Sequence, residues 1–469
     1  MKHYGFIVIG GGPAGHRAAV EAACAGESTL LIERGPRVGG ECVFRGTVPS
    51  KTLLASARGL REMRRACLDV PRVGERSPVP QLMDRVRAVS DGYSRSIGRE
   101  LEAAGVTVIQ ARARFEGPRE ILAERMDGTG LRFSADHVLI ATGTRPRVPR
   151  GIPMDHERVL DSDSILSLAY LPTSLIVVGA GVIGSEFASL FQALGVEVTM
   201  VDSHALPMGF LEPEIAGGFL AAFESEGGRF VPNVRVESMT LCASEGVDTV
   251  LSSGETLHAA KVLVAQGRVA GLQGLGLEEA GLAANRRGLL DVDEFGCTSV
   301  PGIYAAGDVS GPPALAAASM HQGQRAVRHA LGLDPGLPAD RIPSGIYTLP
   351  ELASVGLTEA QAIEEHGAAK VGTCHFSDLA RARIDGATEG MLRMVCDSAA
   401  ESILGVHIIA DRASELIHMG QMALLAGHGP RFFADTIFNF PTYAQAYSAA
   451  ARDALALVRK GCARGDRAA

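Results

Sequence analysis

Short apolar runs alternate with longer stretches of helical periodicity along the first half of the chain. Residues 6–9 and 28–32 predict strands on either side of an alanine-rich helix at about residues 14–25. The same order recurs where predicted strands at 175–178 and 196–201 enclose another helix. Strands that alternate with helices are typical of an α/β fold with a parallel sheet. The pattern therefore predicts two copies of one strand–helix–strand unit.

The segment between the two copies predicts two helices and further strands. The helices are expected over 52–66 and 81–104, and a proline-containing loop over 69–81 joins them. Strands are expected at 106–109 and in the run that ends at residue 140.

Four arginines recur at helical spacing in the first of these helices. They are Arg58, Arg61, Arg64 and Arg65. Such a stripe either binds an anion or is a solvated helix face, and we interpret it as a solvated face.

A glycine-rich turn joins strand to helix in the first copy. Gly10 permits the tight turn, Gly12 lets a pyrophosphate approach the backbone, and Gly15 lets helix and strand pack closely. The helix N-terminus faces the phosphates. Glu33, about 18 residues beyond the turn, can accept a hydrogen bond from a ribose hydroxyl. A G-x-G-x-x-G turn in this context predicts a dinucleotide site.

The second copy carries the same turn at Gly179, Gly181 and Gly184. Two dinucleotide sites in one chain indicate that electrons pass between nucleotides within one protein. Asp202 ends the second strand of this copy, where a carboxylate accepts from a ribose 2′-hydroxyl and repels a 2′-phosphate. This favours NAD over NADP. A protonated His204 would offset the repulsion, unless it is an ordinary surface histidine.

Residues 39–51 hold a lone cysteine, Cys42, ahead of the run Pro49-Ser50-Lys51. Proline in the first turn predicts a helix start at this point. A helix N-terminus carries partial positive charge, and Lys51 adds a full charge to it. We therefore expect the turn to lie against a cofactor that becomes anionic.

The composition limits the partners. The 469 residues carry a net charge of −8, which argues against nucleic acid or an anionic membrane surface as the main partner. No apolar run reaches the roughly 18 residues that span a bilayer, and no signal peptide precedes the first strand, so we expect a cytoplasmic protein. None of the eight cysteines has Cys-x-x-Cys or zinc-ligand spacing, so the sequence predicts no metal site and mostly inert thiols in a reducing compartment.

Residues 39–51 resemble the active-site segment of the flavoprotein disulfide reductases. These are the class I pyridine nucleotide-disulfide oxidoreductases, which include lipoamide dehydrogenase, glutathione reductase and mercuric reductase. The family pattern is Gly-Gly-Thr-Cys, four residues, Cys, one residue and Pro-Ser-Lys. In this chain Cys42 is kept and Thr47 replaces the second cysteine. The Ala-Thr-Gly run at 141–143 and the Gly-Asp pair at 307–308 resemble two further FAD signatures of the family.

The resemblance covers essentially the whole chain. It implies an α/β fold with two Rossmann-like dinucleotide-binding domains, for FAD and NAD(P), followed by a C-terminal α+β dimerisation domain. The implied parts are an FAD domain at 1–150, an NAD(P) domain at 151–275, an FAD-contacting central segment at 276–342, the dimerisation domain at 343–460 and a disordered tail at 461–469.

The resemblance also implies the site residues. Lys51, Glu186 and Thr47 are expected at the catalytic centre, Asp308 on the ribityl chain, and Leu315 near the flavin ring. The residues expected to bind FAD, NAD(H) or NADP(H) are Gly10, Gly12, Pro13, Ala14, Gly15, Glu33, Arg34, Gly39, Gly40, Glu41, Cys42, Thr47, Lys51, Ala113, Thr142, Gly143, Gly179, Gly181, Val182, Ile183, Gly184, Glu186, Asp202, Gly267, Arg268, Gly307, Asp308, Leu315 and Ala316.

Three positions depart from what dithiol chemistry in this family requires. Thr47 replaces the second cysteine, Phe440 replaces the acid/base histidine, and Gln445 replaces the glutamate that orients it. Threonine cannot form a disulfide, and phenylalanine cannot move a proton. The soluble pyridine nucleotide transhydrogenase branch of the family shows nearly this pattern. The chain resembles that branch at 46–51, 344–351, 379–382 and 438–442, and departs from it at Gln445 and at 43–45.

This branch implies an FAD-dependent NAD(P)+ transhydrogenase. A hydride would pass from NADPH to flavin N5 and then to NAD+, without a redox-active disulfide. Lys51 is expected to stabilise the reduced flavin near N5, with Glu186 as its charged partner, unless Glu186 is only a helix-surface acid. The active unit is expected to be a homodimer, in which the stretch around Phe440 reaches the other subunit's flavin.

Two alternatives remain open. Because Asp202 favours NAD(H), the enzyme could instead be an NAD(P)H-dependent diaphorase or quinone reductase of the lipoamide dehydrogenase-like family. The other alternative is a non-catalytic module that senses flavin or nucleotide. The intact Lys51 and the two complete nucleotide folds argue against that second alternative.

Overall fold

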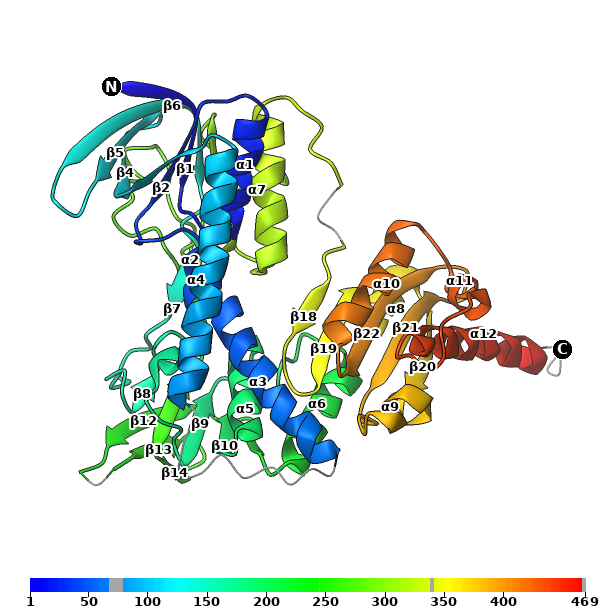
Figure 1. Ribbon diagram of the computed structural model, residues 1–469. Helices are drawn as coiled ribbons and strands as arrows, with labels where there is room; N and C mark the ends of the chain where they lie inside the picture. The colour runs from blue at the N-terminus through cyan, green and yellow to red at the C-terminus, as the bar shows by residue number, and fades with distance from the viewer. Residues whose placement is uncertain (67–78, 244, 338–340, 466–469) are drawn as a thin grey trace. The chain divides into compact units, whose positions relative to one another are not determined.

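The computed structural model describes residues 1–66, 79–243, 245–337 and 341–465 (Figure 1). The chain forms two compact units. Unit 1 comprises Met1–Thr52, Gln81–Arg147 and Gly267–Ala339, and unit 2 comprises Leu53–Pro80, Val148–Gln266 and Asp340–Ala469. The loop predicted at 69–81 lies mostly outside the described residues. Within the described ranges, no helix has both the length and the apolar character needed to cross a membrane.

Unit 1 is built on a mixed sheet with the strand order β3-β2-β1-β6-β5-β4, and β17 pairs with β6. β1 pairs in parallel with β2 and β6, as the α/β pattern predicts, whereas β4 and β5 pair antiparallel. The strands are β1 (Lys2–Ile9), β2 (Thr29–Glu33), β3 (Thr107–Gln110), β4 (Arg112–Gly117), β5 (Glu120–Glu124), β6 (Gly130–Ile140) and β17 (Ile303–Ala305).

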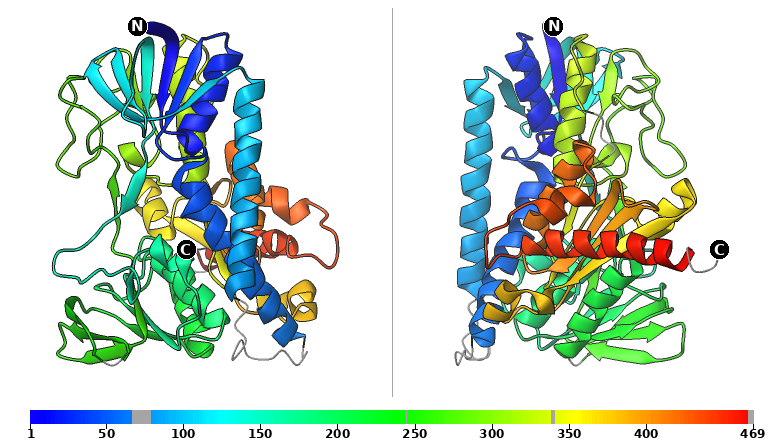
Figure 2. Two further views of the ribbon diagram at one scale, coloured as in Figure 1. Left: turned by 60° about the vertical axis from the view of Figure 1, so that its left-hand side comes forward. Right: turned by 90° about the vertical axis from the view of Figure 1, so that its right-hand side faces the viewer.

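Two helices, α1 (Pro13–Cys24) and α7 (Ala316–Ala330), lie side by side on one face of this sheet, as Figure 2 shows. Their approach is close, because a Cβ added at Gly323 of α7 would lie 2.3 Å from the carbonyl oxygen of Ala14. Residues Ile97 and Leu101 of α4 (Val79–Ala103) join the apolar cluster on the same face.

Strand β1 is buried on both faces, which explains its continuous apolar run. Phe6 and Val8 belong to the cluster that contains residues of α1 and α7, whereas Ile7 and Ile9 belong to the cluster on the other face. The alternation of side chains along a strand divides the run between two cores. The carboxyl end of β1 thereby leads directly into the first glycine turn.

Two helices carry the cysteine segment. The short helix α2 (Gly40–Phe44) holds Cys42, and α3 (Thr47–Arg65) begins at Thr47, two residues before the proline that marked the helix start. In unit 1, the short strands β7 (Thr144–Pro146) and β16 (Arg268–Ala270) pair antiparallel.

Unit 2 contains the second copy of the strand–helix–strand unit. Its parallel sheet has the order β11-β10-β9-β15-β8. A three-stranded antiparallel sheet, β12-β13-β14, contributes to the same core. The elements are β8 (Val159–Leu160), β9 (Ser174–Val178), α5 (Val182–Ala193), β10 (Glu197–Val201), α6 (Pro213–Ser225), β11 (Arg229–Val231), β12 (Val236–Leu241), β13 (Val247–Leu251), β14 (Thr256–Ala259) and β15 (Lys261–Val264).

The C-terminal part of unit 2 is a five-stranded sheet in the order β18-β19-β22-β21-β20, in which each neighbouring pair is antiparallel. Its elements are β18 (Ser344–Ile346), β19 (Glu351–Gly356), α8 (Glu359–His366), β20 (Ala369–His375), α9 (Ala380–Ile384), β21 (Met391–Asp397), β22 (Ile403–Ala410), α10 (Ala413–Leu425), α11 (Pro430–Asp435) and α12 (Gln445–Gly465). Helix α12 extends five residues into the segment predicted as a tail, and residues 466–469 lie outside the description.

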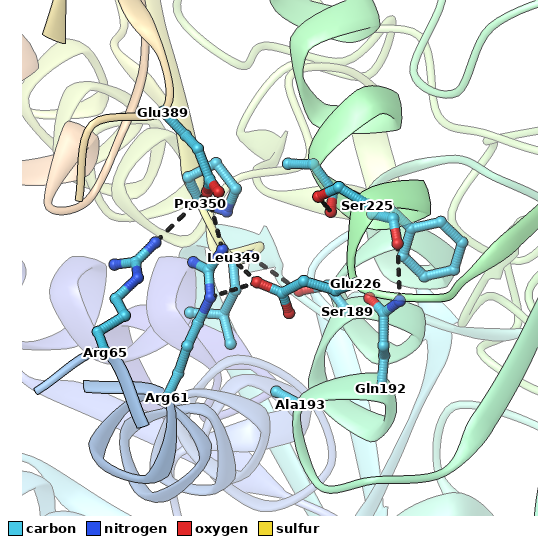
Figure 3. Close-up of polar contacts among 12 residues, drawn as sticks. Arg61, Arg65, Ser189, Gln192, Ala193, Ser225, Glu226, Leu349, Pro350 and Glu389 are labelled. Carbon is cyan, nitrogen blue, oxygen red and sulfur yellow. Dashed lines mark hydrogen bonds and ion pairs between the residues drawn. The ribbon is translucent and has the colours of Figure 1, made fainter. Parts of the chain in front are cut away.

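The prediction that the arginines of α3 form a solvated face was wrong for Arg58, Arg61 and Arg65, which form ion pairs, whereas Arg64 is exposed. The Arg61 side chain is only 7% exposed and contacts Glu226 at 2.5 Å and Glu389 at 3.1 Å. Arg65 binds Asp411 at 2.5 Å. Figure 3 shows Arg61 directed from α3 toward Glu226 and Glu389, and Arg65 directed toward Glu389. The stripe is a set of ion pairs inside unit 2, because carboxylates from three distant loops meet it.

Candidate nucleotide-binding turns and active site

The two glycine turns have the same backbone geometry. Gly10 and Gly179 take positive φ angles of 104° and 101°. Gly12 and Gly181 cap the following helices with φ/ψ of −73°/−172° and −74°/−172°. Corresponding residues of the two copies therefore have matching backbone dihedral angles, as expected for the internal repeat predicted from the sequence.

Contacts explain why these positions are glycine. A Cβ at Gly15 would lie 1.9 Å from the carbonyl oxygen of Gly10, and one at Gly184 would lie 1.8 Å from that of Gly179. Helix and strand can approach this closely only without a side chain. At Gly181 a Cβ would meet nothing within 4 Å among the described residues. The backbone of the second turn is thus open to a ligand.

Both helices leave their first N–H groups without a side-chain cap. Gly12 and Gly181 are the N-caps, and glycine has no side chain that could accept from the first turn. An uncapped helix N-terminus favours an anion through its N–H groups and its dipole. Each turn therefore suits the pyrophosphate of a dinucleotide.

An acid at the end of the second strand clamps each turn. Glu33 accepts from the N–H of Gly11 at 2.7 Å and from that of Gly35 at 2.6 Å. Asp202 accepts from the N–H of Ala180 at 2.6 Å. Each carboxylate oxygen has two lone pairs, so these bonds leave acceptor capacity for a ribose hydroxyl.

Asp202 is further fixed by His204. Its Oδ1 accepts from the His204 backbone N–H at 2.9 Å and lies 2.7 Å from the ring Nδ1. Burial acts to raise the pKa of Asp202, but the hydrogen bonds from Ala180 and His204 outweigh it and lower the pKa. Asp202 is therefore a carboxylate at neutral pH, next to a histidine that can carry the opposite charge.

The cysteine segment packs on the first turn. The N–H of Gly39 donates to the carbonyl of Gly11 at 2.8 Å. Gly40 is so near that a Cβ there would lie 2.8 Å from the Cα of Gly12. Both Gly39 and Gly40 have positive φ, at 126° and 61°, which side chains rarely allow. The start of α2 and the start of α1 are thus brought together.

The Ala-Thr-Gly segment lies beside the same turn. A Cβ at Gly10 would lie 2.4 Å from the carbonyl oxygen of Ala141. The Oγ1 atom of Thr142 is buried and has no hydrogen-bond partner among the described residues. Burying a hydroxyl without a hydrogen-bond partner costs free energy, so most buried hydroxyls in folded proteins have one. The residues present therefore fit a polar ligand such as FAD at this position.

The third FAD-like segment is tied to the same place. Asp308 accepts from the Thr144 hydroxyl at 2.9 Å, and Arg268 donates to that hydroxyl at 2.8 Å. The N–H of Gly307 donates to the side-chain oxygen of Gln322 at 2.9 Å. Sequence reasoning missed Thr144 and Gln322, because each acts through one side chain that no motif marks.

Thr47 lies near the Cys42 thiol, at the position where the family pattern has the second cysteine of the disulfide. Burial is the largest influence on the Cys42 thiol, and the pKa is raised overall, although Thr47 and Lys51 act to lower it. Cys42 and the five other cysteines whose side chains the structure describes are free thiols.

The two predicted catalytic charges lie in different units. Lys51 is half-buried in the second turn of α3 in unit 1, and Glu186 is in α5 of unit 2, so their pairing stays a prediction. Glu186 is only 9% exposed and accepts from the backbone N–H of Tyr347 at 2.9 Å. Glu186 is thus a positioned buried acid and not the helix-surface acid that the sequence left open. The contact with Tyr347 had no sequence signal.

The other predicted cofactor residues lie at element boundaries. Arg34 and Glu41 are outside the strands, at the end of β2 and in α2, and Ala113 is buried in β4. Those that start a helix or precede its first turn are Pro13, Ala14, Val182, Ile183, Leu315 and Ala316. Gly143 and Gly267 have positive φ angles of 63° and 95°.

Family comparisons cover nearly the whole chain. A model of the pyridine nucleotide-disulphide oxidoreductases matches residues 4–323, and a model of the dimerisation domain of these proteins matches residues 342–451. Among curated proteins, the chain is similar to a soluble pyridine nucleotide transhydrogenase of Mycobacterium bovis (strain BCG / Pasteur 1173P2), with 38% identity over 98% of each chain. A soluble pyridine nucleotide transhydrogenase of Marinomonas sp. (strain MWYL1) is 36% identical over 96% of this chain and 98% of that one.

Solved structures agree with this similarity. LpdA from Mycobacterium tuberculosis matches with a TM-score of 0.88 and 32% identity, over 96% of this chain and 99% of that chain. The HOCl-induced flavoprotein disulfide reductase RclA from Escherichia coli matches with a TM-score of 0.85 and 28% identity, over 97% and 100%. The likeness therefore extends over the full length of both relatives.

Proposed function

Because the chain belongs to the pyridine nucleotide-disulphide oxidoreductase family, we propose that it is an FAD-dependent transhydrogenase that moves a hydride between NADPH and NAD+. The enzyme works without a redox-active disulfide. The observation that carries this proposal is the threonine at position 47, near Cys42, where a second thiol would have to stand.

Unit 1 supplies the residues that would hold FAD. The uncapped N-terminus of α1 at Gly12 receives the pyrophosphate, and Glu33 accepts from a ribose hydroxyl. Thr142 gains a partner for its buried hydroxyl, and Asp308 offers a carboxylate for sugar-type hydroxyls. FAD, when bound, supplies the hydride-accepting and hydride-donating chemistry.

Unit 2 supplies the nicotinamide nucleotide turn. The uncapped start of α5 at Gly181 binds the pyrophosphate, and Asp202 binds the adenosine ribose. The two nicotinamide nucleotides use this turn one after the other, because the chain has only two glycine turns of this kind and unit 1 uses the first.

The protein contributes placement and electrostatics at the reacting centre. Lys51 follows the N-terminus of α3 and brings positive charge to a region that gains negative charge. In unit 2, the Tyr347 N–H fixes the Glu186 carboxylate in place. That Glu186 is the charged partner of Lys51 stays a prediction of the family resemblance, since a lysine excluded from water requires such a partner.

The active unit is a homodimer. Two observations support this: the match of residues 342–451 to a dimerisation domain, and exposed apolar side chains near the C-terminus. Ile437 and Phe440 are 96% and 74% exposed in the single chain, and large apolar side chains exposed this far are typical of an interface.

Steady-state assays of the purified yellow protein test the proposal. NADPH with the thionicotinamide analogue of NAD+ should give rapid hydride transfer that depends on bound FAD. NADH with a water-soluble quinone is the comparison reaction. Loss of transfer after removal of FAD and its return on adding FAD provide the control. If FAD-loaded protein transfers no hydride between the two nucleotides, the proposal fails.

One observation favours a second candidate. Asp202 is an ionised carboxylate at the ribose position, which disfavours a nucleotide with a 2′-phosphate. An NADH-dependent quinone reductase needs only one nicotinamide nucleotide and would suit this site. The same pair of assays distinguishes the two, because that enzyme would turn over NADH with quinone and leave NADPH untouched.

A further inference from the structure

A second group of reactive side chains lies in the three-stranded sheet β12-β13-β14 of unit 2. Cys242 follows β12, Asp248 is in β13 and His258 is in β14. Asp248 stands directly opposite His258 in the antiparallel pairing, and it is also opposite Thr240 of β12. Cys242 is two residues beyond Thr240, and side chains two apart on a strand share a face. Strand pairing therefore places the three side chains together.

The distances fit one metal ion. One ligand atom from each of the three residues can be chosen so that all lie within 4.8 Å of one another. His258 Nδ1 and Asp248 Oδ1 are 2.7 Å apart. Tetrahedral zinc, with bonds of about 2.0–2.3 Å, holds its ligand atoms about 3.3–3.7 Å apart. Side-chain shifts of about 1 Å would therefore complete the geometry.

Backbone contacts lie on two sides of the group. The N–H of Cys242 donates to the carbonyl of Gly246 at 3.1 Å, which continues the pairing beyond β12. A Cβ at Gly246 would lie 2.7 Å from atoms of the His258 ring, so glycine makes room for the imidazole. The nearby cation Arg158 donates to the Cys242 carbonyl at 3.1 Å and contacts Asp155 at 3.4 Å. Asp155 offsets the charge of Arg158.

We propose that Cys242, Asp248 and His258 bind one divalent transition-metal ion of the zinc class. A thiolate, an imidazole and a carboxylate form a set that selects zinc over magnesium or calcium, which prefer oxygen ligands. The thiol proton leaves to solvent as the ion binds, and water takes the fourth position on the exposed side. The ion would cross-link three strands, a role separate from hydride transfer.

The sequence predicts no metal site because its cysteines lack the short ligand spacings typical of zinc sites. The three ligands are six and ten residues apart along the chain, so no zinc pattern marks them. Only the register of the two strand pairs brings them within reach of one ion.

Calorimetry with zinc chloride and untagged, FAD-loaded protein tests the site. Wild type should bind one equivalent, and Cys242→Ser or His258→Ala should each weaken that binding at least tenfold. Cys24→Ser and His366→Ala remove an exposed thiol and an exposed imidazole elsewhere, and should leave zinc binding unchanged. Equal zinc affinity in wild type and both ligand variants would overturn the proposal, as would the absence of stoichiometric binding to wild type.

Alkylation provides a second measurement on the same protein. Zinc should slow the modification of Cys242 by iodoacetamide, measured by peptide mass spectrometry, and leave Cys24 unaffected. Magnesium at the same concentration should protect neither thiol. Modification of Cys242 at the same rate with and without zinc would rule out thiolate ligation. His258→Ala should abolish this protection, which would show that His258 and Cys242 bind the same zinc ion.

Discussion

Thr47 stands near the Cys42 thiol inside unit 1 in place of a second cysteine, and this residue limits the redox chemistry that the chain can perform. A threonine hydroxyl cannot exchange with a disulfide, so the thiol can neither be oxidised against position 47 nor store an electron pair there. Beside Cys42, the difference between this chain and a dithiol reductase is thus the single side chain at position 47.

We predict that anaerobic titration reduces the wild-type protein with about two electrons per FAD. No thiolate charge-transfer band should appear, and Cys42→Ser should keep most of the nicotinamide-to-nicotinamide activity. Thr47→Cys is the matched comparison, because it restores a second thiol beside Cys42 and should raise the uptake toward four electrons. Uptake of four electrons by wild type would place a cysteine in the electron path.

The state of Cys42 also predicts a pH dependence. Burial raises the pKa of this thiol, so at any pH the thiolate fraction is smaller than in an unperturbed cysteine. Alkylation of Cys42 should therefore be slow at neutral pH and should rise only above the ordinary thiol range near pH 8.5. The exposed Cys24 serves as the internal reference in the same peptide map. Fast alkylation of Cys42 at neutral pH would show that the thiolate is stabilised.

We expect Asp202 to set the nucleotide preference through its charge. Asp202→Ala with Ser203→Arg removes a carboxylate and adds a partner for a 2′-phosphate. The ratio of kcat/KM for NADPH over NADH should rise by about 10- to 100-fold. Ser203→Arg alone keeps the carboxylate and should shift the ratio less. An unchanged ratio in the double variant would mean that the second turn does not bind the adenosine ribose.

At the scale of elements, ion pairs anchor the C-terminal half of helix α3 within unit 2. Glu226 follows α6, Glu389 precedes β21 and Asp411 follows β22, so three loops of unit 2 converge on two arginines. Arg58 of the same helix pairs with the buried Glu351. A network of this kind holds elements in register, because each buried charge requires its partner.

Arg61→Leu should therefore destabilise the protein. We expect a loss of about 1–3 kcal/mol in the free energy of unfolding, less than for a fully enclosed pair, because Glu226 and Glu389 are 34% and 48% exposed and can regain water. The urea midpoint followed by circular dichroism measures this loss. Arg64→Ala is the control on the same helix, and it should cost about 0.5 kcal/mol or less because its side chain is exposed. Equal effects of the two variants would mean that the network adds no stability.

At the scale of the whole molecule, the C-terminal part of unit 2 exposes large apolar side chains that a single chain does not cover. Ile437 and Phe440 stand on either side of Phe438, which packs against the apolar core beneath. Phe438 is thus held inside, whereas Ile437 and Phe440 form an outer set of exposed side chains. A partner surface is the simplest cover for the outer set.

Light scattering should accordingly give a mass of twice the 49.1 kDa chain at assay concentration. Ile437→Asp would bury a charge in the interface and should shift the protein toward monomer, with loss of activity in parallel. Val148→Asp, at an exposed apolar position outside this segment, is the control and should remain dimeric. A fully active monomer of wild type would contradict the proposed active unit.

The sequence by itself determined the strand–helix order, both glycine turns and the acid that closes each one. These features depend on neighbours along the chain, where hydrophobic period and the backbone freedom of glycine act over a few residues. The absence of a cysteine at position 47 was equally plain, because chemistry follows from residue identity.

Only the tertiary structure decided where charges find their partners. Arg61 was expected in solvent but is buried, because the fold brings the carboxylates of Glu226 and Glu389, 165 and 328 residues away along the chain, into contact with it. Glu186 gains the backbone of Tyr347, and Cys242, Asp248 and His258 meet through strand register. Desolvation makes each of these charges or ligands depend on a partner that local pattern cannot specify, since only packing brings distant segments within a few ångströms.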